Sequence, residues 1–258
     1  TAFAESIAQC TGHTGTFSMG LDAADLNNDG LLDLMSLDMK PQDEPILKAS
    51  TGADHYNLSQ MKLGYGYYHQ FPKNCLQLAV KKPPLPSLAQ QPDSMGLDGM
   101  ADFHNPGVAY MDIGEMAGVA ATDWSWSTLL ADFDNDGWKD IYITNGIWRR
   151  PNDLDYLRYA SNQEVKAFAT DLELAAKMPE GKVANLAFQN QAPTMAQQPP
   201  IPTFKDVSKE WGLDLLGCSN GAAYADLDND GDLDLVVNNL NAEAVIYRNN
   251  AEQFSKNN

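Results

Sequence analysis

A nine-residue acidic segment occurs three times in this chain, at residues 25–33, 132–140 and 226–234. In every copy an Asp or Asn occupies the first, third and fifth positions, a glycine the sixth and an aspartate the ninth. Oxygen atoms at this spacing can surround a hard cation, and Ca²⁺ takes six to eight oxygen ligands. The glycine permits a sharp turn, and without a cation the clustered aspartates would repel one another. The segment therefore predicts a calcium-binding loop.

The candidate ligands in each loop are the side chains of the first, third, fifth and ninth residues and the main-chain carbonyl of the seventh. The resulting metal-binding candidates are Asp25, Asn27, Asp29, Leu31, Asp33, Asp132, Asp134, Asp136, Trp138, Asp140, Asp226, Asp228, Asp230, Asp232 and Asp234. One ion in each loop gives about three Ca²⁺ ions. Three solvated turns are the alternative, because Asp, Asn and Gly favour turns, but turn chemistry does not require this spacing.

These loops are not EF-hands. An EF-hand needs a bidentate Glu at its twelfth position and a helix on each side. The twelfth positions here are Ser36, Ile143 and Val237. The runs after the loops are apolar and rich in β-branched residues, which predicts strands. We therefore expect each loop to join two strands.

The formal net charge of the 258-residue chain is −18, and 12 of its 35 acidic residues lie in the three segments. A chain this acidic is not expected to bind nucleic acid, which needs a basic face, or to dock on anionic lipid. No apolar run reaches membrane-spanning length, so direct membrane insertion is not expected. The chain begins at Thr1 with neither an initiator Met nor a signal segment, which is typical of a fragment or a processed product.

The acidic segments belong to a longer repeat with fixed internal spacing. An aromatic residue stands 22 residues before each segment, and a serine seven residues before it; an Asp or Asn stands five residues after its end. These matching positions are Phe3, Tyr110 and Phe204; Ser18, Ser125 and Ser219; and Asp38, Asn145 and Asn239. The repeat units span residues 3–80, 110–189 and 204–250. Self-similarity of this kind predicts a repeat architecture.

Each unit reads as an antiparallel sheet. The run before the acidic segment is one strand, the run after it is the next, and a further strand follows at 76–80, 186–188 or 245–247. Three or four strands per unit, arranged radially, make a propeller blade. The expected fold class is all-β, with about three four-stranded antiparallel blades of a partial β-propeller over residues 1–258. We expect these blades to form an open arc, which in isolation would be prone to aggregate.

The units resemble the FG-GAP/VCBS repeats of integrin-α-like β-propellers, whose blades carry D-x-[DN]-x-[DN]-G-x-x-D calcium loops. Trp124-Ser125-Trp126, Thr144-Asn145-Gly146-Ile147 and Arg149-Arg150-Pro151-Asn152-Asp153 resemble exported bacterial VCBS proteins of the CRTAC/ASPIC-UnbV type, common in Bacteroidetes. The chain departs from the family pattern at 81–108 and 190–203, where Pro-, Gln- and Met-rich stretches replace a short turn. It also shows no ASPIC/UnbV domain.

This resemblance implies a calcium-binding module of a secreted protein, located outside the cell or on the outer-membrane surface. Its function would be adhesion through a protein or glycan ligand, and its other partners would be the remaining blades of the same full-length chain. A polysaccharide lyase or hydrolase built on a propeller scaffold is the alternative, because fold does not decide function. No nucleophile elbow, P-loop or dinucleotide fingerprint is present, and we name no catalytic residue.

Three insertions interrupt or separate the repeat units. Residues 41–73 are Pro-rich at first and then Tyr- and Gly-rich, and residues 81–108 read as a long loop. Residues 152–178 are the only convincing helical part, with two short helices expected to cap one end of the propeller. A partner-binding role for these helices is the alternative.

The other chemistry-bearing residues have two readings each. Trp124, Trp126, Trp138 and Trp148 could stack on sugar rings or pack between blades. The histidines His13, His55, His69 and His104 show no zinc spacing, which favours surface loops. The cysteines Cys10, Cys75 and Cys218 are either buried free thiols or include a Cys10–Cys218 bridge.

Overall fold

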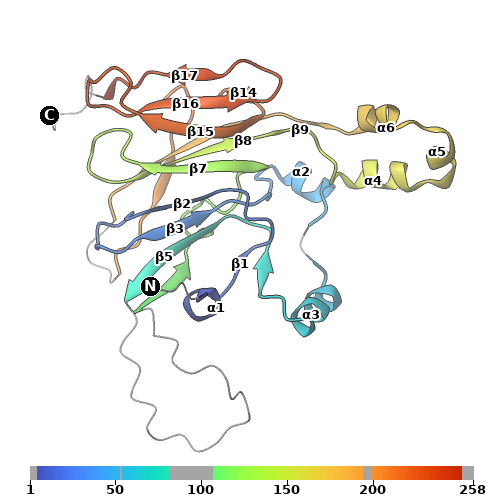
Figure 1. Cartoon of the computed structure of the whole chain (residues 1–258), viewed down its shortest axis with the longest axis horizontal. Helices are drawn as coiled ribbons and strands as arrows, with labels where there is room; N and C mark the ends of the chain where they lie inside the picture. Colours follow the sequence, from blue (N-terminus) through green and yellow to red (C-terminus); the bar gives the residue numbers. More distant parts are fainter. Residues whose placement is uncertain (1–4, 53, 82–106, 194–198, 252–258) are drawn as a thin grey trace, which may run out of the picture.

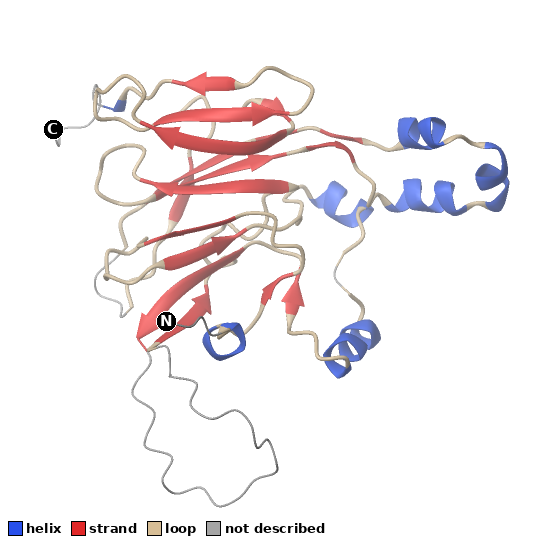
Figure 2. Ribbon diagram, in the orientation of Figure 1, coloured by secondary structure: helices blue, strands red, loops and turns tan. Residues whose placement is uncertain are grey.

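The fold is mostly β, with three antiparallel main sheets beside a smaller number of short helices (Figures 1 and 2). The computed structural model describes residues 5–52, 54–81, 107–193 and 199–251. The first sheet contains β2 (Leu21–Ala24), β3 (Asp33–Ser36), β5 (Cys75–Lys81) and β6 (Val108–Asp112). The second contains β7 (Ser125–Ala131), β8 (Asp140–Asn145), β12 (Leu186–Asn190) and β13 (Phe204–Asp206). The third contains β15 (Ser219–Ala225), β16 (Asp234–Asn239) and β17 (Val245–Tyr247).

Each acidic segment is the loop of a β-hairpin, as predicted. The hairpins are β2–β3, β7–β8 and β15–β16, and their loops lie at the same end of the three sheets (Figure 1). The ninth residue of each segment pairs with the residue just before the loop, in the pairs Ala24↔Asp33, Ala131↔Asp140 and Ala225↔Asp234. The predicted later strands are also confirmed, as β5, β12 and β17. The three hairpins therefore close in the same register.

The strand that opens one repeat unit completes the sheet of the unit before it. Tyr110 lies in β6, which pairs with β5, and Phe204 lies in β13, which pairs with β12. The sequence repeat and the sheet are thus offset by one strand. This offset gives the first two sheets four strands each, whereas the third has three among the described residues. The described sheets do not close into a barrel or a ring.

The three sheets lie next to one another with their first strands in sequence order. Strand β7 contacts β2 on one side and β15 on the other. One apolar cluster includes Leu26, Met35, Leu130 and Ile141, and a second includes Phe133, Tyr142, Val207 and Val237. Burial of each such side chain contributes about 1.5–3 kcal/mol. The main cores are therefore shared between neighbouring sheets.

Two glycines permit the close approach of neighbouring sheets. A Cβ on Gly20 would lie 2.4 Å from the carbonyl oxygen of Trp126. A Cβ on Gly146, which has a φ of +104°, would lie 2.3 Å from the carbonyl oxygen of Gly217. Gly20 directly precedes β2 and Gly146 directly follows β8. Both contacts are to backbone atoms, so no side-chain movement could relieve them.

The recurring serines and asparagines form a buried polar network at the end of the sheets away from the acidic loops. The Ser125 hydroxyl donates to Asn145 Oδ1 at 2.7 Å, and Ser219 donates to Asn239 Oδ1 at the same distance. Asn185 joins the second and third sheets, because its Oδ1 accepts from the Asn145 N–H and its Nδ2 donates to Ser219 Oγ. The matching serines and asparagines of the second and third repeats are therefore structural.

The helical prediction is partly wrong. Residues 152–178 form three helices, α4 (Leu154–Ser161), α5 (Gln163–Phe168) and α6 (Asp171–Lys177), instead of two. They contain no buried residue and project to one side of the sheets, so they do not cap them (Figure 1). Further helices lie outside this insertion, at α1 (Ile7–Cys10), α2 (Glu44–Ala49) and α3 (Tyr56–Gly64). The side chains of Asp43 and His55 accept hydrogen bonds from backbone N–H groups in the first turns of α2 and α3. These N-terminal caps were not predicted.

The remaining strands form short two-stranded sheets. They are β1 (Thr14–Gly15) with β4 (Gln70–Phe71), β9 (Ile147–Arg149) with β10 (Glu180–Gly181), and β11 (Val183–Ala184) with β14 (Leu216–Gly217). The long loop expected at 81–108 lies, apart from its ends in β5 and β6, outside the described residues. None of the described helices is long and apolar enough to cross a bilayer.

Candidate metal centres

The three acidic loops share one backbone conformation. The fourth residue of each loop is an asparagine in the left-handed region, with φ values of 54°, 58° and 62° for Asn28, Asn135 and Asn229. The glycine at the sixth position has a φ of 85°, 93° or 97°. Asparagine tolerates this region better than other side chains, and glycine enters it without strain. The sequence thus selects the same turn three times.

Side-chain hydrogen bonds hold each loop around its own centre. In the second loop, Asp132 accepts from the N–H groups of Asp136 at 3.1 Å and Gly137 at 3.0 Å. The first residues of the other loops, Asp25 and Asp226, accept from the corresponding N–H groups. The fifth-position carboxylate accepts from the seventh N–H in all three loops, at 2.8 to 3.1 Å. These bonds fold the carboxylates inward.

The structure brings together the side chains of the first, third and fifth positions. Carboxylate oxygens of Asp132, Asp134 and Asp136 lie within 4.8 Å of one another, and so do those of Asp226, Asp228 and Asp230. In the first loop, Asp25 and Asp29 flank the amide of Asn27, whose Oδ1 accepts from the Asp29 N–H at 3.3 Å. Burial, together with the nearby charges of Asp134 and Asp132, raises the pKa of Asp136. Each centre therefore concentrates hard oxygen ligands and negative charge.

The ninth-position aspartates have a second role that the sequence did not predict. Both oxygens of Asp140 accept backbone hydrogen bonds, from Phe133 at 3.0 Å and from Asn190 at 2.9 Å. Asp33 accepts in the same way from Leu26 and Ala79, and Asp234 from Leu227 and Asn249. The ninth residue thus fastens the loop to the third strand of its sheet or, in the third loop, to the segment just after β17. It is not a member of the converging triads.

Burial strongly raises the pKa of two of these aspartates. It raises the pKa of Asp140 to about 8 and that of Asp33 to about 6, although backbone N–H donors act in the opposite direction. The carboxylates of Asp134 and Asp136 add to the rise at Asp140. A cation in the loop would offset this repulsion and favour the ionised form.

The seventh residues contribute N–H donors to the loops. Leu31, Trp138 and Asp232 each donate to the fifth-position carboxylate of their own loop. The side chain of Asp232 turns instead toward the second loop, where Asn135 Nδ2 donates to its Oδ1 at 2.6 Å. Asn28 Nδ2 similarly reaches from the first loop to the Gly137 carbonyl of the second, at 3.1 Å. The fourth-position asparagines therefore connect successive loops.

Residues from neighbouring strands also contact the third-position aspartates. Gln189 Nε2 donates to Asp134 Oδ2 at 2.5 Å. At the equivalent place in the third sheet, Arg248 forms ion pairs with Asp228 at 2.8 Å and Asp230 at 3.0 Å. Each of these two residues directly precedes the asparagine whose N–H binds the ninth aspartate. This matching position, one residue before Asn190 and Asn249, is the sequence signal that could have identified them.

No protein-family model and no curated protein matches this chain. The assignment of the loops therefore rests on their own geometry and chemistry.

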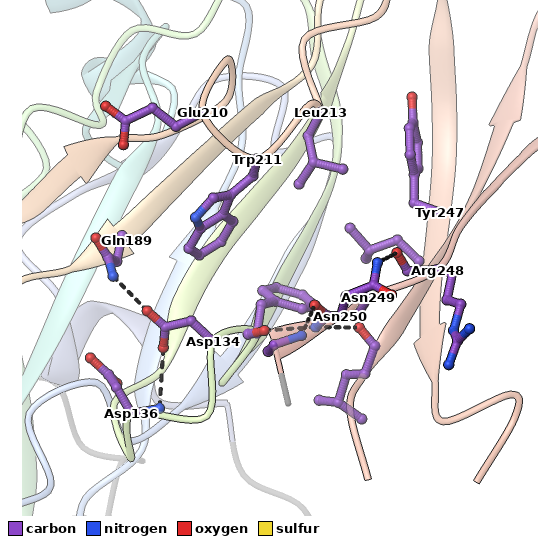
Figure 3. Close-up of a pocket in the computed structure, with 14 residues that line it drawn as sticks. Asp134, Asp136, Gln189, Glu210, Trp211, Leu213, Tyr247, Arg248, Asn249 and Asn250 are labelled. Atoms are coloured by element: carbon purple, nitrogen blue, oxygen red, sulfur yellow. Dashed lines mark hydrogen bonds between the residues drawn. The ribbon is translucent and has the colours of Figure 1, made fainter. Parts of the chain in front are cut away.

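A pocket of about 690 Å³ adjoins the second loop (Figure 3). Asp134 and Asp136 lie on one wall, while Trp211, Leu213 and Tyr247 give the pocket an apolar side. The segment 248–251, which follows β17, also lines the pocket. Trp211 is not among the four tryptophans predicted to stack or pack. Its position in the pocket could not be read from sequence, because the pocket joins segments that are far apart along the chain.

The four candidate stacking tryptophans have mixed environments. Trp126 is partly buried, and its Nε1 donates to the Gly146 carbonyl at 2.7 Å. Trp124 and Trp138 are also partly buried. Trp148 is 38% exposed and lies beneath Lys182, whose Nζ is 4.9 Å from the ring centroid. The contacts of Trp126 favour packing, while Trp148 keeps an accessible ring.

Among the cysteines and histidines, Cys10 and His13 lie in environments that differ from those predicted. All three cysteines are free, with Cys75 and Cys218 buried and Cys10 only partly so. The surface-loop prediction is wrong for His13, which is partly buried and contacts Asp112. His55 caps α3, His69 is exposed, and His104 lies outside the described residues.

Proposed function

We propose that this chain is a calcium-binding FG-GAP/VCBS-type module of an exported protein and that each main sheet is one propeller blade. The observation that supports it best is the threefold recurrence of one loop geometry, with the same backbone conformation, the same internal hydrogen bonds and the same hairpin register. Solvated turns would not need to repeat all three features. The order β2, β7, β15 of neighbouring first strands is also the order expected for blades around an axis.

The ion in this proposal has a structural role. It neutralises the converging carboxylates, which lets the hairpin close with its flanking strands in register. Every proposed ligand is a hard oxygen, as Ca²⁺ prefers, and extracellular modules bind it at about 10⁻⁴–10⁻³ M. That range suits the cell exterior or the outer-membrane surface, where the ion would be bound.

The molecular role that we propose is adhesion to a protein or glycan. The calcium centres lie along one end of the sheets, where the bound ions would fix the loops as a rigid surface. The pocket beside the second loop adds the indole of Trp211 to this end, and aromatic rings stack readily on sugar faces. Carboxylates that bind the ion are not available as an acid–base pair, so the geometry supports binding over catalysis.

A thermal unfolding series tests the calcium proposal. An ion at tenfold its Kd stabilises the folded state by about 1.4 kcal/mol per site, so three sites should raise the Tm by roughly 10 °C. We expect EDTA to lower the Tm and Ca²⁺ to restore it. Equimolar Mg²⁺ should restore it less, because Mg²⁺ demands a stricter octahedral geometry. A Tm that stays constant from 0 to about 10 mM Ca²⁺, a range well above the expected Kd, would contradict the proposal.

A further inference from the structure

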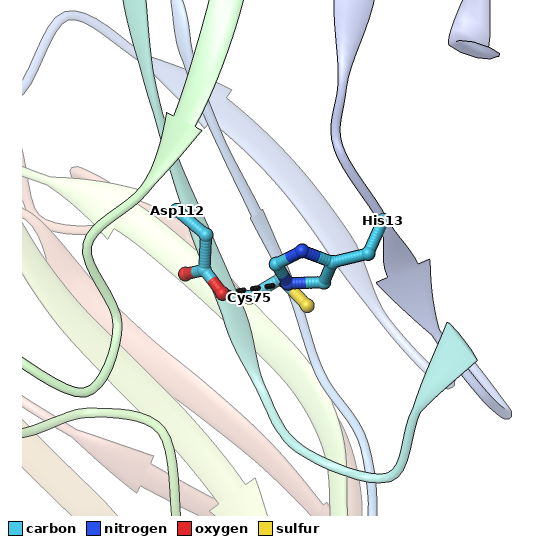
Figure 4. Close-up of side chains that lie close together, drawn as sticks. All are labelled: His13, Cys75 and Asp112. Atoms are coloured by element: carbon cyan, nitrogen blue, oxygen red, sulfur yellow. Dashed lines mark hydrogen bonds and ion pairs between the residues drawn. The ribbon is translucent and has the colours of Figure 1, made fainter. Parts of the chain in front are cut away.

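A second cluster of metal-binding side chains lies away from the acidic loops. It joins His13, just before β1, to Cys75 at the start of β5 and Asp112 at the end of β6 (Figure 4). One ligand atom from each residue lies within 4.8 Å of the other two. The thiol is buried, and the side chains of His13 and Asp112 are only 19% and 7% exposed. These three residues are far apart in sequence, which is why spacing did not reveal them.

The surroundings of the cluster fix its geometry. Asp112 Oδ2 accepts from His13 Nε2 and from Lys73 Nζ, each at 2.8 Å, while its Oδ1 accepts from the Gly114 N–H at 2.9 Å. The ring of Phe71 stands edge-on against His13, with centroids 5.1 Å apart. Hydrogen bonds of this kind orient metal ligands and hold their carboxylates in place. Lys73 can keep its contact with Asp112 as such an outer partner.

A buried amide oxygen lies beside the cluster. Gln77 pairs directly with Asp112 across β5 and β6, and it stands on the same face of β5 as Cys75. Its Nε2 donates to the His13 carbonyl at 3.4 Å, so the amide group lies next to His13. Its Oε1 is buried, and no described residue donates a hydrogen bond to it. Buried polar atoms normally have a partner, so this oxygen is an independent sign of a missing ligand.

A nucleophilic role for the cysteine does not fit this environment. The Cys75 thiol is buried, with only 1% of the residue exposed. Reactive cysteines are partly exposed. The imidazole of His13 is also already engaged with Asp112 through Nε2. A cation that takes all three side chains as ligands would account for their convergence.

We propose that His13, Cys75 and Asp112 form a three-ligand site for Zn²⁺, distinct from the calcium loops. Zn²⁺ takes imidazole nitrogen, thiolate sulfur and carboxylate oxygen, whereas Ca²⁺ takes oxygen only. The thiolate and the carboxylate offset the two charges of the ion, and Lys73, which pairs with Asp112, adds one further positive charge beside the site. A fourth ligand, from water or from the Gln77 amide oxygen, would complete a tetrahedron. The site would fasten the segment around β1 to the first sheet.

Cobalt substitution tests the site in the full chain. Co²⁺ takes the place of Zn²⁺ and gives a thiolate-to-metal charge-transfer absorption when cysteine is a ligand. The titration is made in excess Ca²⁺, so that the acidic loops are already occupied. We expect this absorption to saturate at one equivalent of Co²⁺ and to disappear when Zn²⁺ is added. Absence of the absorption in the wild-type chain would overturn the proposal.

Variants assign the ligands. Cys75→Ser should abolish the charge-transfer absorption, and His13→Gln should weaken Co²⁺ binding by at least about 100-fold, the upper range for an outer partner. Cys218→Ser is the matched control, because it removes another buried free thiol and should leave the titration unchanged. His13→Gln decides the question if the Cys75 variant does not fold. An unchanged titration in folded His13→Gln, or loss of the signal in Cys218→Ser alone, would contradict the assignment.

Discussion

Asp136 is the residue at which the calcium proposal can be tested most simply. Its carboxylate converges with those of Asp132 and Asp134, and their proximity adds to the raised pKa that burial gives it. Asp136→Ala should therefore remove one ligand and lower the Tm in calcium by about 3–5 °C, the loss of one site. In EDTA the deficit should narrow, because the substitution also removes repulsion.

The matched control for this change is Asp171→Ala. Asp171 is an exposed aspartate in the first turn of α6, away from the loops. Loss of an exposed surface charge rarely changes the free energy of unfolding by more than about 0.5 kcal/mol. Equal Tm shifts for the two variants in calcium would count against Asp136 as a ligand.

The buried ninth aspartates predict a pH dependence of the metal-free protein. The folded-state pKa values of Asp140 and Asp33 are raised to about 8 and about 6, from an ordinary value of 3.8. A raised acid pKa contributes stability that is fully present below the unfolded value and is lost as the pH rises through the folded value. In EDTA, the free energy of unfolding should therefore fall between pH 4 and pH 8.

Calcium should change this profile. The bound ion favours the ionised aspartates, so the decline should be smaller or reversed when the loops are filled. Urea unfolding at several pH values, with EDTA and with Ca²⁺, gives both curves. Parallel curves would show that the ion and these aspartates are not coupled.

The spacing of residues in the loops predicted which side chains would converge. It did not predict the residues outside the loops that these side chains contact. The first, third and fifth positions meet as expected because one turn places them, and a turn is a local property of the sequence. Asp134 contacts Gln189, which lies in β12, and Asp228 contacts Arg248, which directly follows β17. Such contacts depend on strand pairing, which spacing within the loop does not encode.

At the scale of elements, the hairpin loops are linked in series. Asn135 in the second loop donates to Asp232 in the third, whereas Asn229 has the same backbone conformation without such an inter-loop bond among the described contacts. Asn135→Gly should keep the positive φ and remove the link. We expect it to cost about 1–2 kcal/mol more than Asn229→Gly, because the acceptor is a charged group.

Asn229→Gly is a matched comparison because both substitutions add the same backbone freedom. Urea unfolding of the two variants in the same buffer gives the difference directly. Equal losses would mean that the bond between the loops contributes nothing to stability.

The strands were predicted well, and the helices less well, for a physical reason. Each hairpin follows from an apolar run on either side of a defined turn. The offset of β6 and β13 into the preceding sheet was not predicted, because periodicity finds repeats without showing which strands pair. Helices α2 and α3 bury no residue, so they leave no apolar stripe in the sequence.

At the scale of the whole molecule, close contact between sheets accounts for the core. The apolar clusters join neighbouring sheets, and the backbones of neighbouring repeat units meet at Gly20 and Gly146. The loops at one end and the polar network of Asn145, Asn185 and Ser219 at the other fasten the same sheets. If the loops hold calcium, the ions stabilise the stacking of sheets as well as the individual hairpins.

The three proposed calcium sites should differ in their affinity for Ca²⁺. Arg248 already pairs with Asp228 and Asp230, so its guanidinium must give way before an ion can use those carboxylates fully. The third loop should therefore bind Ca²⁺ most weakly, although it contains the most aspartates. A count of aspartates in the loop sequences alone would predict the opposite, with the third loop as the tightest site. The difference arises because Arg248 meets the third loop only in the folded chain.

The number of Ca²⁺ ions bound per chain tests most directly whether the three acidic loops are calcium sites. Equilibrium dialysis or calorimetric titration of the metal-free protein should give three ions, two of them tighter than the third. Removal of one loop's ligands by Asp132→Ala with Asp136→Ala should lower the count to two, while Asp171→Ala should leave it at three. If the chain binds no Ca²⁺ at millimolar concentration, or if the number of bound ions is unchanged in the loop variant, the loops are not calcium sites.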